Sequence, residues 1–274
     1  MKQTENEMML SVTLPSIRTE KIHDLVTSLA NSCTKYPAEL IVCGPYPLPD
    51  IMNGMVNIKY IKDFGSPCRA NQLAASVAEG KYITWMADDG LFFPNELDRV
   101  IDHLEELEST YGSNRDIVSC VYSEGANASP YSPDYFSCNS HKSLKSKYIP
   151  DSNLIINLGI MHRTFFDELG GLNCAWETCP MAHTDLGNRA AYMGANMMLY
   201  LGQVAHHTHM PEETGDHGPI HRAQIKRDEP LYRAKYDNPK WYEKETIIRM
   251  DNWKNSPQIW VERFTDTPSI EKKL

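Results

Sequence analysis

The spacing of apolar residues changes in a regular order along the N-terminal third of the chain. Over 10–14 apolar and polar residues alternate, as is typical of a strand, and over 22–29 the apolar residues recur at helical spacing. Short apolar runs at 39–43, 56–61 and 82–86 predict three more strands. This part of the chain therefore contains several strands in close succession.

Helical spacing returns between these strands and again after them. Apolar residues over 73–78 predict a helix that ends at Gly80, because glycine readily adopts the left-handed conformation of a helix C-terminus. Pro94 opens another helix, whose inner face extends from 97 to 107. Strands that alternate with helices form βαβ units, and these units make a mainly parallel sheet. We therefore expect an α/β fold with a central sheet flanked by helices.

The second half of the chain continues the pattern less regularly. Strands are predicted at 117–122, 154–161 and 197–201, and a helix at 185–193. Between the first two of these strands lies a polar segment, 125–147, that contains several Pro and Ser residues. Loops of this length are often functional lids, so we expect this segment, or part of the tail after His209, to order over a bound ligand.

Composition and charge narrow the class of protein. Hydrophobic residues make up 41% of the 274 residues and charged residues 23%, which are ordinary values for a globular chain. A formal net charge of -9 gives no general attraction to nucleic-acid backbones. No apolar run approaches the ~20 residues that span a bilayer, and the N-terminus lacks the apolar segment of a signal peptide, so we expect a cytoplasmic protein. The seven cysteines form no CxxC pair and are expected to be reduced thiols.

Two adjacent acids, Asp88 and Asp89, directly follow the buried strand predicted at 82–86. Ligands of mainly parallel sheets bind beyond the carboxyl ends of the strands, which is where these acids fall. Two neighbouring carboxylates repel each other unless both face water or one binds a cation, and hard divalent ions prefer such oxygen ligands. The alternative is a solvated turn, since Asp-Asp-Gly is also common turn chemistry.

Several motifs in a fixed order resemble glycosyltransferase family 2 and its GT-A fold relatives. These motifs are PSIR after the first strand, EGKYITWMADDGLFFPNEL, RTFFDELGGL and HTDLGNRAAYMG, and together they cover about 9–210. The resemblance implies a GT-A, Rossmann-like domain over 1–210 with a small antiparallel extension on the acceptor side. Its nucleotide-binding half would cover about 9–122 and its acceptor half about 150–210, with a C-terminal extension, 211–274, packed on the domain.

In this family the strand-end acids form a DxD motif that holds a divalent cation against the diphosphate of a nucleotide sugar. With the comparison anchored on Pro94, the first Asp of the motif falls on Ala87 and the last on Asp89. The resemblance therefore implies that Asp89 is a ligand of Mn2+ or Mg2+, with Asp88 as a contact to ribose or metal. Such a cation would stabilise the charge that develops on the leaving diphosphate.

Other residues match donor-binding positions of the family. The early loop that contacts the nucleotide base is matched by Pro15, Ser16 and Arg18. Arg69 and Asn71 resemble donor-contacting residues, although an exposed Arg and a helix-capping Asn are the alternative interpretation. The family's acid after the second strand is replaced by Cys-Gly-Pro, so the identity of the base stays open.

On the acceptor side, the sequence departs from the family at the residues that would act as the general base. Relatives carry an acidic pair that deprotonates the acceptor hydroxyl in an inverting reaction, and here that pair reads Ala182 and His183. Histidine can act as a general base, while Asp185 is the nearest carboxylate and could act itself or orient the imidazole. The alternative for Asp185 is that it only caps the predicted helix.

A His-rich segment follows the last predicted strand. Family members often place a His there that completes the metal or diphosphate site, and the candidates are His207 and His209. A solvated loop is the alternative. A zinc site built on the sequence HHTH is weaker, since no HExxH spacing accompanies it.

The sequence therefore predicts a metal-dependent, inverting glycosyltransferase, a hexosyl- or pentosyltransferase, that uses a nucleotide-sugar donor. A catalytically weak sugar-nucleotide or glycan binding protein on the same fold is the main alternative, and a zinc hydrolase is a further one. The acceptor stays open among a glycan, a lipid-linked glycan, a protein, a small molecule and a modified nucleobase.

Overall fold

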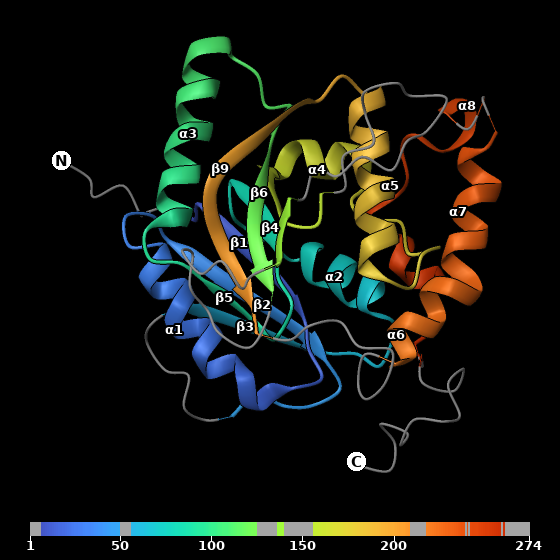
Figure 1. Cartoon of the computed structure of the whole chain (residues 1–274), viewed down its shortest axis with the longest axis horizontal. Helices are drawn as coiled ribbons and strands as arrows, with labels where there is room; N and C mark the ends of the chain where they lie inside the picture. Colours follow the sequence, from blue (N-terminus) through green and yellow to red (C-terminus); the bar gives the residue numbers. More distant parts are fainter. Residues whose placement is uncertain are drawn as a thin grey trace.

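A single twisted sheet runs through the molecule, and helices cover both of its faces (Figure 1). The structure is a computed structural model, and it describes residues 7–49, 56–124, 136–139, 156–208, 218–238, 240, 242–258 and 260. Six of the nine strands point the same way, because β6 and β9 run parallel to the first four strands of the chain. The predicted α/β fold with a mainly parallel central sheet is confirmed.

The N-terminal half of the sheet is entirely parallel and has the strand order β3-β2-β1-β4. Helices join β1 to β2 and β3 to β4, as the alternating pattern of the sequence predicts. Its elements are β1 (Leu10–Pro15), α1 (Ile22–Ser32), β2 (Ala38–Gly44), β3 (Asn57–Lys62), α2 (Pro67–Ala75) and β4 (Tyr82–Trp85).

The other half of the sheet mixes strand directions. Strand β8 lies antiparallel between β4 and β6, and the short strands β5 and β7 are antiparallel to β9 and β6. The antiparallel part expected beside the parallel sheet is therefore present. Its elements are β5 (Gly90–Phe92), α3 (Glu96–Tyr111), β6 (Asp116–Glu124), β7 (Phe136–Asn139), β8 (Gly159–His162), α4 (Arg163–Leu169), α5 (Cys179–Tyr192) and β9 (Asn196–His207).

After β9 the described chain forms short helices that lie on the outer side of α5 (Figure 1). These are α6 (Gly218–Ala223), α7 (Glu229–Tyr236) and α8 (Tyr242–Glu245), with a π-helical turn (Gln224–Asp228) and a 3-10 helix (Met250–Asn255). No helix in the described part of the chain is both long and apolar enough to cross a membrane.

Two apolar layers, one on each face of the sheet, hold the helices in place. The layer under α1 and α3 includes Leu25 and Val100, and the layer under α4 and α5 includes Phe165 and Leu186. Every third or fourth residue of α1 is buried, which is the helical spacing that the sequence shows. Hydrophobic burial on both faces thus fixes the sheet between its helices.

Helix α2 and the turn before β4 correct one prediction. The hydroxyl of Ser66 accepts a hydrogen bond from the main-chain N–H of Arg69, with Pro67 in the first turn, so the helix begins earlier than 73 and ends at Ala75. Gly80 does not end it. A Cβ on Gly80 would lie 2.5 Å from the main-chain N of Ser11, so glycine is needed there because the chain passes close to β1.

The second half of the chain brings further corrections to element boundaries. Helix α5 begins at Cys179 and not near 185, because Pro180 occupies its first turn, so Asp185 lies inside the helix and does not cap it. Strand β8 begins only at Gly159. Residues 136–139 of the predicted loop 125–147 pair with β6 as β7, and the rest of that loop lies outside the described residues.

Candidate functional site

The acids Asp88 and Asp89 lie just beyond the carboxyl end of β4, in the turn that leads into β5. Strand β1 is the parallel neighbour of β4 and ends at Pro15, so the loop that follows β1 lies beside the two acids. Both acids are nearly fully buried, with exposed fractions of 4% and 5%. The Asp-Asp-Gly sequence is therefore not a solvated turn.

Asp88 binds the loop after β1 through both of its carboxylate oxygens. Its Oδ2 accepts hydrogen bonds from the hydroxyl of Ser16 at 3.1 Å and from the main-chain N–H groups of Ile17 and Arg18 at 3.1 and 3.0 Å. Its Oδ1 accepts hydrogen bonds from the Arg18 guanidinium, from Nε at 2.8 Å and also from Nη2. These contacts fix the conformation of the loop and leave little of Asp88 for a metal ion.

The end of β2 has no room for a side chain at Gly44. The main-chain N–H of Ser16 donates to the carbonyl of Cys43 at 3.0 Å, so the loop after β1 passes directly over the end of β2. A Cβ on Gly44 would lie only 1.9 Å from the carbonyl oxygen of Ser16. Glycine at 44 therefore allows a close approach of two main chains that any side chain would prevent.

Asp89 lies between this loop and the end of β9. One carboxylate oxygen lies 3.4 Å from Nη2 of Arg18, and no hydrogen bond within the described residues reaches the carboxylate. Its main-chain carbonyl accepts hydrogen bonds from the N–H of Thr208 at 3.0 Å and from the Thr208 hydroxyl at 3.2 Å. The next residue, Gly90, pairs with His207 across β5 and β9.

His207 is the histidine that the fold brings to the acids. Its ring packs against Tyr122, with the ring centroids 5.0 Å apart. Burial lowers the pKa of His207, and the negative charge of Asp89 opposes that shift. His206 points elsewhere, since its Nδ1 lies 2.8 Å from the hydroxyl of Ser123. His209 lies outside the described residues.

The side chains at this place fit a divalent cation that takes some of its ligands from the protein and the others from a bound substrate. Asp89 supplies a carboxylate and His207 an imidazole, a pair that suits Mn2+ when phosphate oxygens and water fill the other positions. Across the described ranges, no three His, Cys, Asp or Glu side chains come together as a metal-binding group. Catalytic zinc sites usually have three protein ligands, and the zinc alternative stays untested because His209 lies outside the described residues.

Arg69 is buried among internal partners, and the interpretation as an exposed arginine is wrong. Its side chain is 2% exposed, and its Nε and Nη2 donate to the carboxylate of Asp63 at 3.0 and 3.1 Å. Its Nη1 donates to the carbonyl oxygens of Trp253 and Ser256. These bonds hold the C-terminal segment against the loop that follows β3.

Asn71 is likewise held inside the protein. Its Oδ1 accepts a hydrogen bond from the hydroxyl of Thr13 at 2.9 Å, and its Nδ2 donates to the Sγ of Cys179 at 3.3 Å. Asn71 therefore links β1 to the first turn of α5. It does not cap α2, since Ser66 does so.

Asp185 is fully buried in a cluster of charged and polar groups. Its carboxylate accepts hydrogen bonds at 2.7 Å from Arg189 Nε, Lys235 Nζ and the hydroxyl of Tyr236. Burial raises the pKa of this carboxyl, but the two cations outweigh that effect and hold its pKa at about 2. The cluster joins α7 to α5, and both carboxylate oxygens already have donors.

His183 lies two residues earlier on α5, against the last residue of β4. Its ring stacks on Trp85, with the centroids 4.7 Å apart and the planes at 26°. Its Nε2 is buried and has no hydrogen-bond partner among the described residues. Burial lowers the pKa of His183 to about 3, so the imidazole is neutral at physiological pH.

A chain of contacts that sequence reasoning missed connects His183 to His207. The indole N–H of Trp85 donates to the main-chain carbonyl of Asn157 at 2.7 Å, and Nδ2 of Asn157 donates to the hydroxyl of Tyr122 at 3.0 Å. The Tyr122 ring then packs against His207. A Trp three positions before the first acid was the one signal in the sequence, whereas nothing marked Asn157.

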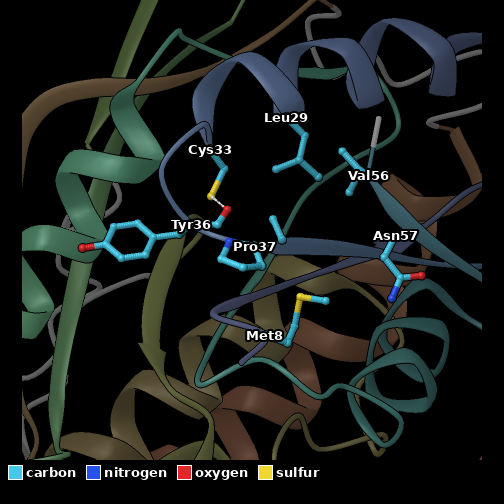
Figure 2. A pocket seen from close by; sticks show the side chains of 8 residues that line it. Met8, Leu29, Cys33, Tyr36, Pro37, Val56 and Asn57 are labelled. Carbon is cyan, nitrogen blue, oxygen red and sulfur yellow. Dashed lines mark hydrogen bonds between the residues drawn. The ribbon is translucent and has the colours of Figure 1, made fainter. Parts of the chain in front are cut away.

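The cavity drawn in Figure 2 lies at the other end of the sheet. It encloses about 460 Å³ near the start of β2 and the end of α1, whereas the acids follow the end of β4. Burial raises the pKa of Cys33 in this cavity to about 12, so its thiol is unreactive. The cavity is therefore separate from the candidate site. It is lined by Met8, Leu29, Cys33, Tyr36, Pro37, Ala38, Val56 and Asn57.

Comparison with known proteins gives a similarity of fold. No family model and no curated protein matches the sequence. Among solved structures, S. aureus TarS 1-349 in complex with UDP-GlcNAc matches with a TM-score of 0.51 and 16% identity, over 97% of this chain and 78% of that chain. The same fragment with UDP gives a TM-score of 0.49 at 17% identity, over 86% of this chain and 72% of that chain.

A longer S. aureus TarS structure matches over 85% of this chain with 16% identity and a TM-score of 0.48. This chain spans only 44% of that longer structure. At such low identity the likeness concerns the fold alone. The chain thus has an α/β fold of the GT-A type, with the acids at the carboxyl edge of its parallel strands.

Proposed function

We propose that this protein is a metal-dependent, inverting glycosyltransferase that uses a nucleotide-sugar donor. The observation that carries the proposal is the placement of Asp88 and Asp89 between the loop after β1 and His207 at the end of β9. Support for the donor class comes from TarS, which shares the fold and has been crystallised with UDP-GlcNAc. A UDP-sugar is therefore the first donor to test.

The loop from Pro15 to Arg18 holds the nucleoside in this proposal. Asp88 fixes the loop through two main-chain N–H groups and the Ser16 hydroxyl, so the loop is ordered before the donor arrives. The Arg18 guanidinium sits beside both acids and carries the positive charge nearest to them. That charge favours the binding of a diphosphate.

Asp89 and His207 would hold the divalent cation, together with oxygens of the diphosphate; His209 stays a prediction. When bound, the cation supplies Lewis-acid stabilisation of the charge on the leaving diphosphate. Asp89 is suited to this because no hydrogen bond within the described chain occupies its carboxylate. Burial favours the neutral form of His207, which is the form that can ligate.

On the acceptor side, the geometry favours His183 over Asp185 as the group that receives the hydroxyl proton. The oxygens of Asp185 accept hydrogen bonds from three side chains, whereas Nε2 of His183 has no partner in the described part of the chain. In an inverting transfer the acceptor oxygen attacks the anomeric carbon from the face opposite the diphosphate. The proton of the hydroxyl then passes to His183.

A catalytically weak sugar-nucleotide binding protein is the second candidate, and one observation favours it. A histidine whose pKa is about 3 is a poor base for a sugar hydroxyl, and the neighbouring Asp185 has a pKa of about 2. Binding of the donor is common to both candidates, so only turnover separates them.

Calorimetric titration of UDP with Mn2+, with Mg2+ and with a chelator tests the proposal. We expect tighter binding with metal, and we expect Asp89→Ala to lose that increment. Asp102→Ala serves as the matched control, because Asp102 is a half-exposed surface acid paired with Lys35. Equal affinity in metal and in chelator would contradict the cation site. Release of UDP from a panel of UDP-sugars, with and without candidate acceptors, then separates transferase from binding protein.

A further inference from the structure

Two polar atoms next to Trp85 lack hydrogen-bond partners within the described residues. They are Nε2 of His183, whose side chain is 5% exposed, and Oδ1 of Asn157. Both residues contact the same indole, since His183 stacks on its face and the Asn157 carbonyl accepts its N–H. The two residues therefore both contact Trp85, His183 through its ring and Asn157 through its main chain.

Buried polar atoms are almost always paired, because an unpaired one loses its hydrogen bonds to water without replacement. Two such atoms beside one ring indicate that a bound molecule supplies the missing partners. The rest of Asn157 is held firmly, because its Nδ2 donates to the Tyr122 hydroxyl at 3.0 Å. Its Oδ1 thus has a fixed direction, as expected of a group that recognises a ligand.

The place of these atoms in the fold favours the acceptor as the bound molecule. Trp85 is the last residue of β4, three positions before Asp88, and Tyr122 packs against His207. The two unpaired atoms therefore belong to the edge of the sheet at which the donor diphosphate would bind. An acceptor must approach the same edge to reach the sugar.

The chemistry of the lining selects a neutral ligand. Burial keeps His183 uncharged, and the side chains of Asn157, Trp85 and Tyr122 carry no charge. Asp185 is the one acid on α5, and Asp185, Arg189 and Lys235 are already engaged in ion pairs with one another. A phosphate or carboxylate here would lose its hydration without gaining a counter-charge, whereas hydroxyl groups can donate to Oδ1 and bond to Nε2.

We propose that Oδ1 of Asn157 and Nε2 of His183 form a subsite that binds hydroxyl groups of a neutral carbohydrate acceptor. This inference rests on the proposed function and names the class of acceptor. The hydroxyl at His183 is the attacking one. Asn157 positions the sugar through a second hydroxyl and takes no part in proton transfer.

Nuclear magnetic resonance of the full chain saturated with UDP and Mg2+ tests the subsite. The probes are methyl glycosides of glucose, galactose and N-acetylglucosamine, and the charged comparison is glucose 6-phosphate with glucuronic acid. We expect at least one neutral glycoside to shift both the His183 ring signals and the Trp85 indole signal. We expect the charged sugars to bind at least 10-fold more weakly.

Substitutions then locate the contact. Asn157→Ala and Asn157→Asp should each weaken the binding of the neutral glycoside by at least 10-fold while the affinity for UDP is unchanged. The control is Asn114→Ala, a surface amide that bonds only to Thr164 within the described chain. If the Asn157 variants lose UDP binding as well, the subsite is tested by the wild-type protein alone. The readouts are then the His183 and Trp85 signals and the affinity for neutral against charged sugars.

The inference is wrong if no neutral glycoside moves either signal, if the charged sugars bind equally well, or if the Asn157 variants bind the glycoside normally. The proposed function has a separate readout in the same samples. Failure of the wild-type protein to bind UDP contradicts the proposed function, whereas UDP binding without any glycoside effect contradicts only the subsite.

Discussion

Arg18 and Asp88 are joined through both the side chain and the main chain of the arginine. The guanidinium donates to Oδ1 of Asp88, while the main-chain N–H of Arg18 donates to Oδ2 at 3.0 Å. The acid is thus the anchor of the loop and not only the partner of one cation. Its removal should act on the whole of the loop after β1.

Asp88→Ala is therefore expected to weaken UDP binding by at least 10-fold both in Mn2+ and in chelator, because the loop loses its anchor in either condition. Asp89→Ala should affect only the metal-dependent part. Calorimetry of the two variants measures this difference directly. If both variants lost only the metal-dependent increment, Asp88 would be a ligand and its role as an anchor would be wrong.

The edge on which the acids lie could be predicted because its signals are local. An apolar run that stops at two acids marks the end of a buried strand, and β4 does end three positions before Asp88. The strands β1, β2, β3 and β6 were also predicted from local signals, namely alternating or short runs of apolar residues. Local patterning also gave the mainly parallel sheet, since helices between strands allow few other arrangements.

The environment of Asp185 could not be predicted, because its partners come from distant parts of the chain. Lys235 and Tyr236 follow it by about fifty residues and meet it only when α7 packs against α5. The pairing of Arg69 with the carbonyl of Ser256 is equally remote. Comparison with the family motifs therefore predicted Asp185 and Arg69 as site residues, whereas in the folded protein both side chains bond to buried groups of the protein itself.

The Asp185 cluster should make stability depend on pH. The pKa of Asp185 is about 2 in the folded protein and 3.8 for the free side chain, so the cluster contributes about 2 kcal/mol above pH 4. That contribution is lost as the pH falls through 2. We expect Asp185→Asn to lower the free energy of unfolding at pH 7, and the difference from wild type to shrink toward pH 2.

Urea unfolding at several pH values measures this effect. Asp251→Asn is the control, since Asp251 also has a pKa of about 2 but lies on the surface beside Arg249, where solvent screens the pair. Its substitution should leave stability nearly unchanged. A constant difference between Asp185→Asn and wild type across the pH range would refute the linkage.

Substitution of Arg69 tests whether its side chain contacts the nucleotide-sugar donor or only stabilises the fold. Arg69→Met should lower the free energy of unfolding by about 3 kcal/mol, because the buried Asp63 carboxylate loses its cation. Its affinity for UDP, measured under conditions where the variant is folded, should stay within about twofold of wild type. Arg249→Ala, which removes an exposed arginine, is the control for stability. A large loss of UDP affinity in folded Arg69→Met would restore the donor contact.

The last prediction concerns the proton acceptor. If His183 receives the hydroxyl proton, His183→Ala should lower turnover by about 100- to 10,000-fold with UDP affinity nearly unchanged. Since the pKa of His183 is about 3, kcat/KM should show no acid limb near 6 to 7 and should stay flat down to about pH 4. His183→Asp places a carboxylate at the proposed position of the base, and burial beside Trp85 should raise the pKa of that carboxylate. We therefore expect His183→Asp to retain turnover, with a kcat/KM that falls at acidic pH where the wild type stays flat. We expect His183→Asn to be inactive. Pre-steady-state rates of UDP release across pH, with a donor and acceptor in hand, measure all three variants. Normal turnover in His183→Asn would place the base elsewhere.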